Sequence, residues 1–301
     1  MVARVMLAGC MLLAVADGVA YGGEGHGQHA GQTHQPAADV AQPWTTYPLI
    51  EETSASMRNR AVFDVRNLPA LSVQVYPPTG QGKFPERFAV QGGDAPYESL
   101  LQNGRFALTP GRKGNYHWIT ARAEVDGEVR VASSVRYFSN PGPAPTAMLA
   151  QPKHELEIVP MPLPREHWHY REGESWKFLV RFQGSPQAGA TLRLITEQGS
   201  RVQFVADRNG VAEVTIPQDL PLPTGGANAG HHTRQKARFV LVTSHDKAQK
   251  HYVTTFNYHY IPSAMRDRSL MAGTIFMLLG GLLATPLLRR TGRGKKEKLN
   301  A

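Results

Sequence analysis

Short segments of alternating apolar and polar residues fill most of the chain between residues 44 and 261. Segments 61–66, 71–76 and 87–91 each carry apolar side chains at every second position. A period of two places alternate side chains on opposite faces of an extended chain, so each segment predicts a half-buried β-strand. The pattern therefore predicts an all-β ectodomain.

The next two alternating segments predict a hairpin. Segments 116–125 and 128–138 flank Asp126-Gly127, a dipeptide that suits the positive φ angles of a type I′ turn. Strands that follow one another at intervals of about ten residues are typical of a β-sandwich. We therefore predict a first sandwich over residues 44–139.

A linker at 140–152 separates this region from a second one. It contains four prolines and no alternation. Residues 153–261 repeat the strand pattern, and segments 201–206 and 211–216 bracket an Asn-Gly turn that predicts a second hairpin. Large side chains fall on one face of another predicted strand: Trp176, Phe178, Val180 and Phe182. The prediction is two β-sandwiches in series.

Apolar segments at both ends predict export and membrane anchoring. Residues 1–20 have a positive start at Arg4, an apolar centre and a small-x-small ending, the pattern of a secretory signal peptide. Residues 269–288 form a 20-residue stretch without charge, long enough to cross a bilayer as one helix. The tail 289–301 carries six Lys or Arg against one Glu, and basic flanks stay cytoplasmic. We expect a single-pass protein of a bacterial inner membrane with residues 21–268 in the periplasm.

Each end also has an alternative interpretation. Residues 7–10 (LAGC) match a lipoprotein box, but the apolar run continues past Cys10, which favours a cysteine removed with the signal peptide. The apolar C-terminal stretch ends in Arg-Arg and also fits a sorting signal that is later removed.

Charge and composition exclude several function classes. Five of the nine net positive charges lie in the basic tail, so the rest of the chain offers no basic stripe for nucleic acid. Cys10 is the only cysteine, which excludes an intrachain disulfide, a thiolate cluster and a cysteine nucleophile. Motifs of serine hydrolases, zinc proteases and phosphate loops are absent from the sequence. We expect a protein that is not an enzyme and binds no nucleic acid.

Histidine is the residue type that indicates chemistry. The polar segment 21–43 is predicted to be a disordered tether, and it carries His26, His29 and His34. Loosely spaced imidazoles favour weak binding of a divalent transition metal, Ni, Co or Cu, and a solvated spacer with incidental histidines is the alternative. A mature chain that began at Glu24 would place His26 third, which suits square-planar Cu(II) or Ni(II).

His167 and His169 form the second candidate metal site. Residues two apart on an extended chain share a face, so both imidazoles can bind one ion. Such a site needs a third donor, and the nearby candidates are His154, Glu166 and Glu172. The alternative to a metal site is that this aromatic-rich segment forms a solvent-exposed sheet edge.

Four other histidines are expected to be structural or exposed. His251 and His259 share a face of one predicted strand, but at ~3.4 Å per residue they lie about 27 Å apart, too far to hold one ion together. His117 and His245 stand alone within other predicted strands.

Motifs of the second region stand in an order known from one family. They are LEIVP at 156–160, GESWKFLV at 173–180, GSPQAGA at 184–190, DRNGVA at 207–212 and TTF at 254–256. Over residues 154–288 the chain resembles the NikK-type family, the nickel-uptake substrate-specific transmembrane region. The resemblance implies an immunoglobulin-like or prealbumin-like sandwich followed by one C-terminal helix. It also implies an accessory component of a nickel or cobalt transporter of the energy-coupling type, and it supplies no ligand residues.

Together these features predict two immunoglobulin-like or prealbumin-like β-sandwiches in series with one C-terminal transmembrane helix. The expected function is that of a membrane-anchored periplasmic accessory or binding component of a nickel or cobalt uptake system. Its expected partners are transporter membrane subunits. The alternative is a structural or protein-interaction module of an envelope complex that has no metal ligand.

Overall fold

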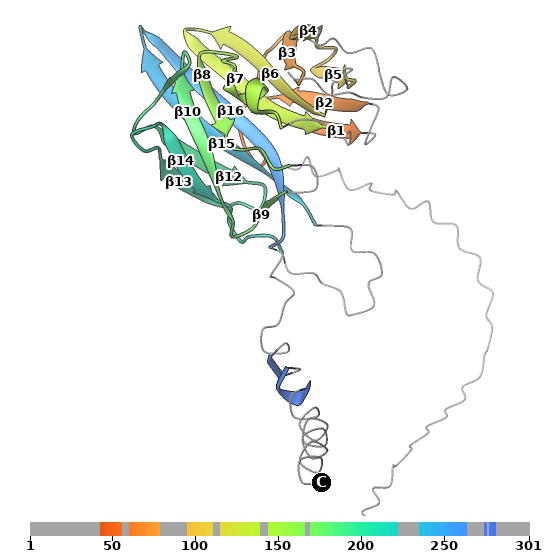
Figure 1. Cartoon of the computed structure of the whole chain (residues 1–301). Coiled ribbons are helices and arrows are strands. Elements are labelled where there is room, and N and C mark those ends of the chain that lie inside the picture. The colour runs from red at the N-terminus through yellow and green to blue at the C-terminus, as the bar shows by residue number, and fades with distance from the viewer. Residues whose placement is uncertain are drawn as a thin grey trace, which may run out of the picture. The chain divides into compact units, whose positions relative to one another are not determined.

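The computed structural model describes residues 43–55, 60–78, 95–110, 115–138, 144–165, 169–221, 235–263, 274–275 and 277–280. Within these ranges the secondary structure is mostly β-strand (Figure 1), in agreement with the predicted all-β class. Several predicted features lie outside the described residues: the signal peptide, the tether histidines His26, His29 and His34, the strand at 87–91, and His167.

The strands follow the alternating segments closely. The first predicted module contains β1 (Leu49–Ala55), β2 (Ala61–Arg66), β3 (Ser72–Tyr76), β4 (Tyr97–Leu100), β5 (Arg105–Leu108), β6 (Tyr116–Val125) and β7 (Glu128–Tyr137). After the short helix α1 (Thr146–Ala150), the second contains β8 (Leu156–Pro160), β9 (Tyr170–Arg171), β10 (Ser175–Phe182), β11 (Ser185–Pro186), β12 (Thr191–Thr196), β13 (Arg201–Val205), β14 (Val211–Thr215), β15 (Ala237–Lys247) and β16 (Lys250–Ile261).

One nine-stranded sheet contains strands of both predicted modules. Its order is β13-β12-β15-β16-β7-β6-β3-β4, with β9 also paired to β16. The joint is a parallel pair between β7 and β16, from His251 opposite Glu128 to Phe256 opposite Ser133 (Figure 1). Pairing two long strands satisfies backbone groups that would otherwise form open sheet edges. The modules are therefore joined through a common sheet as well as through the chain between them.

Two smaller sheets pack on the large one. One has the order β1-β2-β5. In the other, β10 pairs with β11, β14 and β8. The larger hydrophobic core lies in the second module but includes Trp118 of β6, whose ring stacks on Phe256 of β16 at 5.6 Å between centroids. Burial of such aromatic side chains is the main stabilising contribution to a core. Residues of the first module thus complete the core of the second.

The predicted hairpin at Asp126-Gly127 is confirmed. β6 and β7 are antiparallel with Val125 opposite Glu128, and both turn residues have positive φ, 53° for Asp126 and 80° for Gly127. These are the angles that a type I′ turn requires.

The predicted hairpin at 201–216 is wrong. β13 pairs with β12 in the large sheet, whereas β14 pairs with β10 in the smaller one. The tight turn does form, because the Asp207 carboxylate accepts N–H bonds from Asn209 (2.8 Å) and Val211 (2.9 Å). However, the Gly210 carbonyl accepts the N–H of Val180 at 2.8 Å, which directs the chain onto β10. The turn therefore crosses from one sheet to the other.

The predicted linker is partly helical and packed. Met148 and Leu149 of α1 are buried, and the Arg181 guanidinium donates to the carbonyls of Leu149, Ala150 and Gln151. Arg181 also pairs with the buried Glu157 at 2.6 Å. A buried ion pair needs such additional hydrogen bonds to offset desolvation, and here they hold the end of α1 against β8 and β10.

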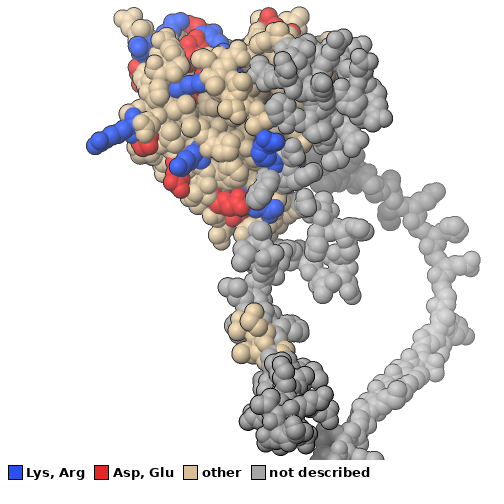
Figure 2. Space-filling view, in the orientation of Figure 1, with Lys and Arg blue, Asp and Glu red and all other residues tan. Residues whose placement is uncertain are grey.

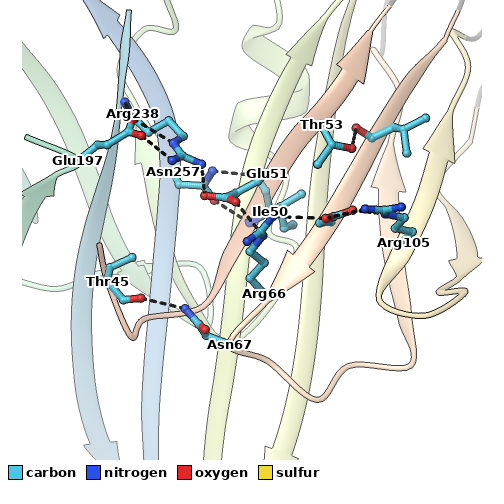
Figure 3. Close-up of polar contacts among 12 residues, drawn as sticks. Thr45, Ile50, Glu51, Thr53, Arg66, Asn67, Arg105, Glu197, Arg238 and Asn257 are labelled. Carbon is cyan, nitrogen blue, oxygen red and sulfur yellow. Dashed lines mark hydrogen bonds and ion pairs between the residues drawn. The ribbon is translucent and has the colours of Figure 1, made fainter. Parts of the chain in front are cut away.

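Ion pairs connect the modules at the surface. Lys and Arg side chains are interspersed with Asp and Glu over the face shown in Figure 2. Glu51 of β1 accepts Arg66 of β2 at 2.8 Å and Arg238 of β15 at 2.6 Å, and Arg238 also pairs with Glu197 at 2.5 Å (Figure 3). Because Glu51 is 7% exposed, this pairing is less screened than an ordinary surface pair.

The predicted transmembrane stretch at 269–288 is described only at 274–275 and 277–280, which are helical. Within the parts of the chain that the structure describes, no helix has the length and apolar character needed to cross a bilayer.

Candidate metal centre

Strand register brings two histidines together. β9 runs parallel to β16, with Tyr170 opposite Tyr260 and Arg171 opposite Ile261. One step back along this ladder places His169 opposite His259. Opposite residues of paired strands lie on the same face, so their side chains are neighbours. The two imidazole rings are 5.8 Å apart between centroids, with an angle of 47° between planes.

Aromatic side chains pack around this pair. His259 stacks on Tyr258 at 4.5 Å, and Tyr258 meets the ring of Tyr170 edge-on at 5.5 Å. Tyr170 is fully buried and contacts Trp176 at 4.8 Å. The Tyr170 hydroxyl and the Trp176 ring nitrogen are buried without a hydrogen-bond partner among the described residues, which costs free energy. Ring packing therefore holds Tyr170 and Trp176 in this cluster.

The environment keeps His259 neutral. Burial lowers its pKa from the ordinary 6.5 to about 3, and the nearby positive charge of Lys236 acts in the same direction. No hydrogen bond joins its ring nitrogens to any other described residue. Because a metal ion competes with protons for imidazole nitrogen, a ring that stays neutral at pH 7 is in the ligating form.

The spacing of the rings fits joint coordination of one ion. Metal–imidazole bonds of about 2.0–2.1 Å place two ring centroids roughly 4.5 to 6.3 Å apart for ligand angles between about 90° and 180°. The observed 5.8 Å lies within this range. The spacing of the His169 and His259 rings therefore permits a shared ion.

The third donors expected from the sequence are otherwise engaged or lie elsewhere. Glu172 is 2% exposed and accepts the N–H of Leu220 at 2.7 Å. His154 contacts the Ser133 hydroxyl at 3.2 Å. Among the described residues no cluster of three or more His, Cys, Asp or Glu is placed to hold a metal. Glu166 lies with His167 outside the described residues.

The structure thus pairs His169 with a histidine that the sequence interpretation left out. His259 was expected to be structural or exposed, and it is partly buried with its ring beside that of His169. Sequence offers no signal for this, because β9 has only two residues and its partner strand lies some ninety positions later. His117 and His245 contact the rings of Phe138 and Phe182, as expected for structural positions.

Two clefts lie away from the histidine pair. One of about 550 Å³ lies beside the turn before β12, and another of about 370 Å³ lies beneath the segment 43–47. Both are lined by Arg193 of β12 and Gln203 of β13, and neither is lined by His169 or His259. The two clefts therefore share two of their lining residues.

Solved structures match the chain only at low identity and low TM-score. No protein-family model matches the chain, and no curated protein matches it. A bacterial ice-binding adhesin structure is 12% identical, with 71% of this chain covered and a TM-score of 0.23; the chain spans 64% of that structure. The D0-D1 domain of intimin is 13% identical over 71% of this chain and 96% of its own, with a TM-score of 0.22. Two fibronectin type III domains of chicken tenascin are 9% identical over 70% of this chain and 98% of their own, with a TM-score of 0.21.

Proposed function

We propose that this protein binds a divalent transition metal outside the cytoplasm and passes it to a membrane transporter, with Ni or Co as the first candidates and Cu as the next. The observation that carries the proposal is the His169–His259 pair, two imidazoles 5.8 Å apart with His259 held neutral. Imidazole is a ligand suited to Ni, Co, Cu and Zn, whereas Mg and Ca prefer oxygen. The metal is cargo here and not a catalytic cofactor.

Two protein ligands suit transfer better than storage. An ion held by only two imidazoles keeps further coordination positions for water or for groups of an accepting protein. Such an ion exchanges ligands more readily than one in a closed four-ligand site. The tether histidines His26, His29 and His34 and the nearby His167 are additional predicted donors, but the proposal does not depend on them.

The proposal keeps the expected topology. The signal peptide exports the chain, two immunoglobulin-like or prealbumin-like sandwiches face the periplasm, and residues 269–288 anchor them in the inner membrane. The expected partners are membrane subunits of a nickel or cobalt transporter.

Isothermal titration of the full chain, purified without a histidine tag, tests the proposal. We expect Ni²⁺ or Co²⁺ to bind with a dissociation constant below about 10 μM. His169→Ala and His259→Ala should each weaken binding at least about tenfold, since each removes one of two ligands. His251→Ala removes an exposed histidine of the same strand and should leave affinity unchanged. If none of Ni, Co, Cu and Zn binds, the proposal is wrong.

A protein-interaction module without a metal is the second candidate. The observation that favours it is the outer edge of the large sheet, where β13 pairs with β12 alone among the described strands. Uptake measured under metal limitation separates the two candidates. Loss of uptake in the His169→Ala, His259→Ala double variant supports the metal function, and full uptake supports the interaction module.

A further inference from the structure

β13 (Arg201–Val205) has an open hydrogen-bonding side. It stands at one end of the nine-stranded sheet and pairs only with β12 among the described strands. Two backbone hydrogen bonds, one at each end of β13, show which of its residues bond to β12. Thr196 N–H donates to the Ser200 carbonyl (3.0 Å), and Ala206 N–H donates to the Ala190 carbonyl (2.9 Å). Since backbone bonds in an antiparallel pair involve every second residue, the even-numbered positions of β13 bond to β12.

The odd-numbered positions therefore face outward. Arg201, Gln203 and Val205 direct their N–H and C=O groups away from β12, and no described residue pairs with them. Val205 is 63% exposed. An edge with three alternate residues whose backbone N–H and C=O groups are free can accept another extended chain.

The surface beside this edge is positively charged. Arg193 and Gln203 line both clefts, Arg201 lines the one beneath the segment 43–47, and the described lining of both contains no Asp or Glu. The guanidinium of Arg193 lies over the ring of Tyr47 at 5.7 Å, which restrains it.

Neither of these two arginines forms an ion pair with any described residue. Seven arginines of other described strands do have a carboxylate partner: Arg66, Arg105, Arg122, Arg130, Arg136, Arg181 and Arg238. The charge beside β13 is thus uncompensated within the described parts of the chain, so the complementary ligand is acidic.

We propose that β13 accepts an extended acidic segment of a partner protein as an added strand, with carboxylates of that segment on Arg201 and Arg193. Backbone bonds to Arg201, Gln203 and Val205 supply affinity, and side chains at alternate positions supply specificity. A second copy of this chain is the poorer occupant, because edge-to-edge pairing would double the positive charge at the junction. This inference concerns a partner surface and is independent of the metal proposal.

The test uses a short fluorescent peptide, acetylated and amidated, with Glu at every second position and Val between. The control peptide carries Lys in place of Glu. Anisotropy with the full chain should show binding of the Glu peptide only, and hydrogen exchange should show new protection within residues 201–205. Arg193→Gln with Arg201→Gln should weaken binding about fivefold or more. Arg208→Gln, an exposed arginine on the following turn, should have no effect.

Two further variants test the outward edge of β13 directly. Gln203→Pro removes an outward N–H without removing a bond to β12, so the variant should fold yet lose the peptide. If Gln203→Pro unfolds, the double variant Arg193→Glu with Arg201→Glu is tested instead. Its reversed charge should make it bind the Lys peptide in place of the Glu peptide. Equal binding of both peptides, an unchanged preference after charge reversal, or protection of 201–205 by self-association without peptide would each overturn the proposal.

Discussion

The side-chain amide of Asn257 makes both of its backbone hydrogen bonds with one residue, Ile50. Its Oδ1 accepts the Ile50 N–H at 3.0 Å, and its Nδ2 donates to the Ile50 carbonyl at 2.8 Å (Figure 3). The Thr255 hydroxyl also donates to the Pro48 carbonyl at 2.8 Å. Side chains of β16 thus take the place of a neighbouring strand where β1 begins, and they fasten the first module onto the second.

Replacing Asn257 should loosen this junction. Asn257→Leu leaves a buried N–H and a buried carbonyl of Ile50 without partners, so we expect a loss of about 2–4 kcal/mol in the free energy of unfolding. Thr255→Val removes one hydroxyl donor and should cost about 1 kcal/mol. Urea unfolding measures both. Equal, small effects of the two substitutions would contradict this view of the junction.

Two glycines with nearly the same backbone angle should respond differently to substitution. Gly189 (φ 72°) has open space where a Cβ would lie, whereas at Gly210 (φ 73°) a Cβ would lie 2.8 Å from the Val180 carbonyl oxygen. Gly189→Ala carries only the left-handed backbone cost of about 1–2 kcal/mol. Gly210→Ala adds a steric cost of about 1–3 kcal/mol, because backbone atoms cannot move aside easily. Thermal unfolding should therefore show the greater loss of stability for Gly210→Ala, and the reverse order would contradict the close approach of this turn to β10.

Stability should fall in mild acid because of buried neutral histidine. Burial lowers the pKa of His117 to about 4 from 6.5, so between these values the unfolded chain binds a proton that the folded chain excludes. The stability conferred by the neutral ring is complete above pH 6.5 and is lost as the pH falls towards 4, in total about 3 kcal/mol.

Urea unfolding at about pH 7.5 and about pH 4.5 checks this dependence, because the two values bracket most of the window between the unfolded and folded pKa. The wild type should lose more stability between the two values than His117→Asn, which has no titrating ring at this position. An identical loss in both proteins would show that His117 does not contribute.

The alternating pattern predicted which face of a strand is buried, but it did not predict which strands pair. The period-two pattern placed β6 and β7 correctly, and the Asp126-Gly127 dipeptide identified their turn, because both features are local. The Asn209-Gly210 turn was also real, yet the strands beside it belong to different sheets, because Gly210 bonds to Val180 some thirty residues earlier. A local sequence pattern does not indicate contacts between residues so far apart in the chain.

The same limit applies to the candidate site. His169 could be singled out from its neighbour at 167, since spacing along one strand is visible in sequence. His259 could not, because its proximity depends on the register of β9 against β16. The shared sheet is a further case: β7 and β16 carry ordinary strand patterns, and nothing in either indicates that they pair in parallel.

A count of the imidazoles on one bound ion tests whether His169 and His259 share a metal. Electron paramagnetic resonance of the Cu²⁺-loaded full chain resolves coordinated nitrogen, and the substitutions His26→Gln, His29→Gln and His34→Gln remove the tether donors. We predict two imidazole nitrogens at neutral pH and one after His259→Ala. A spectrum that His259→Ala leaves unchanged would contradict the claim that His169 and His259 share a metal ion.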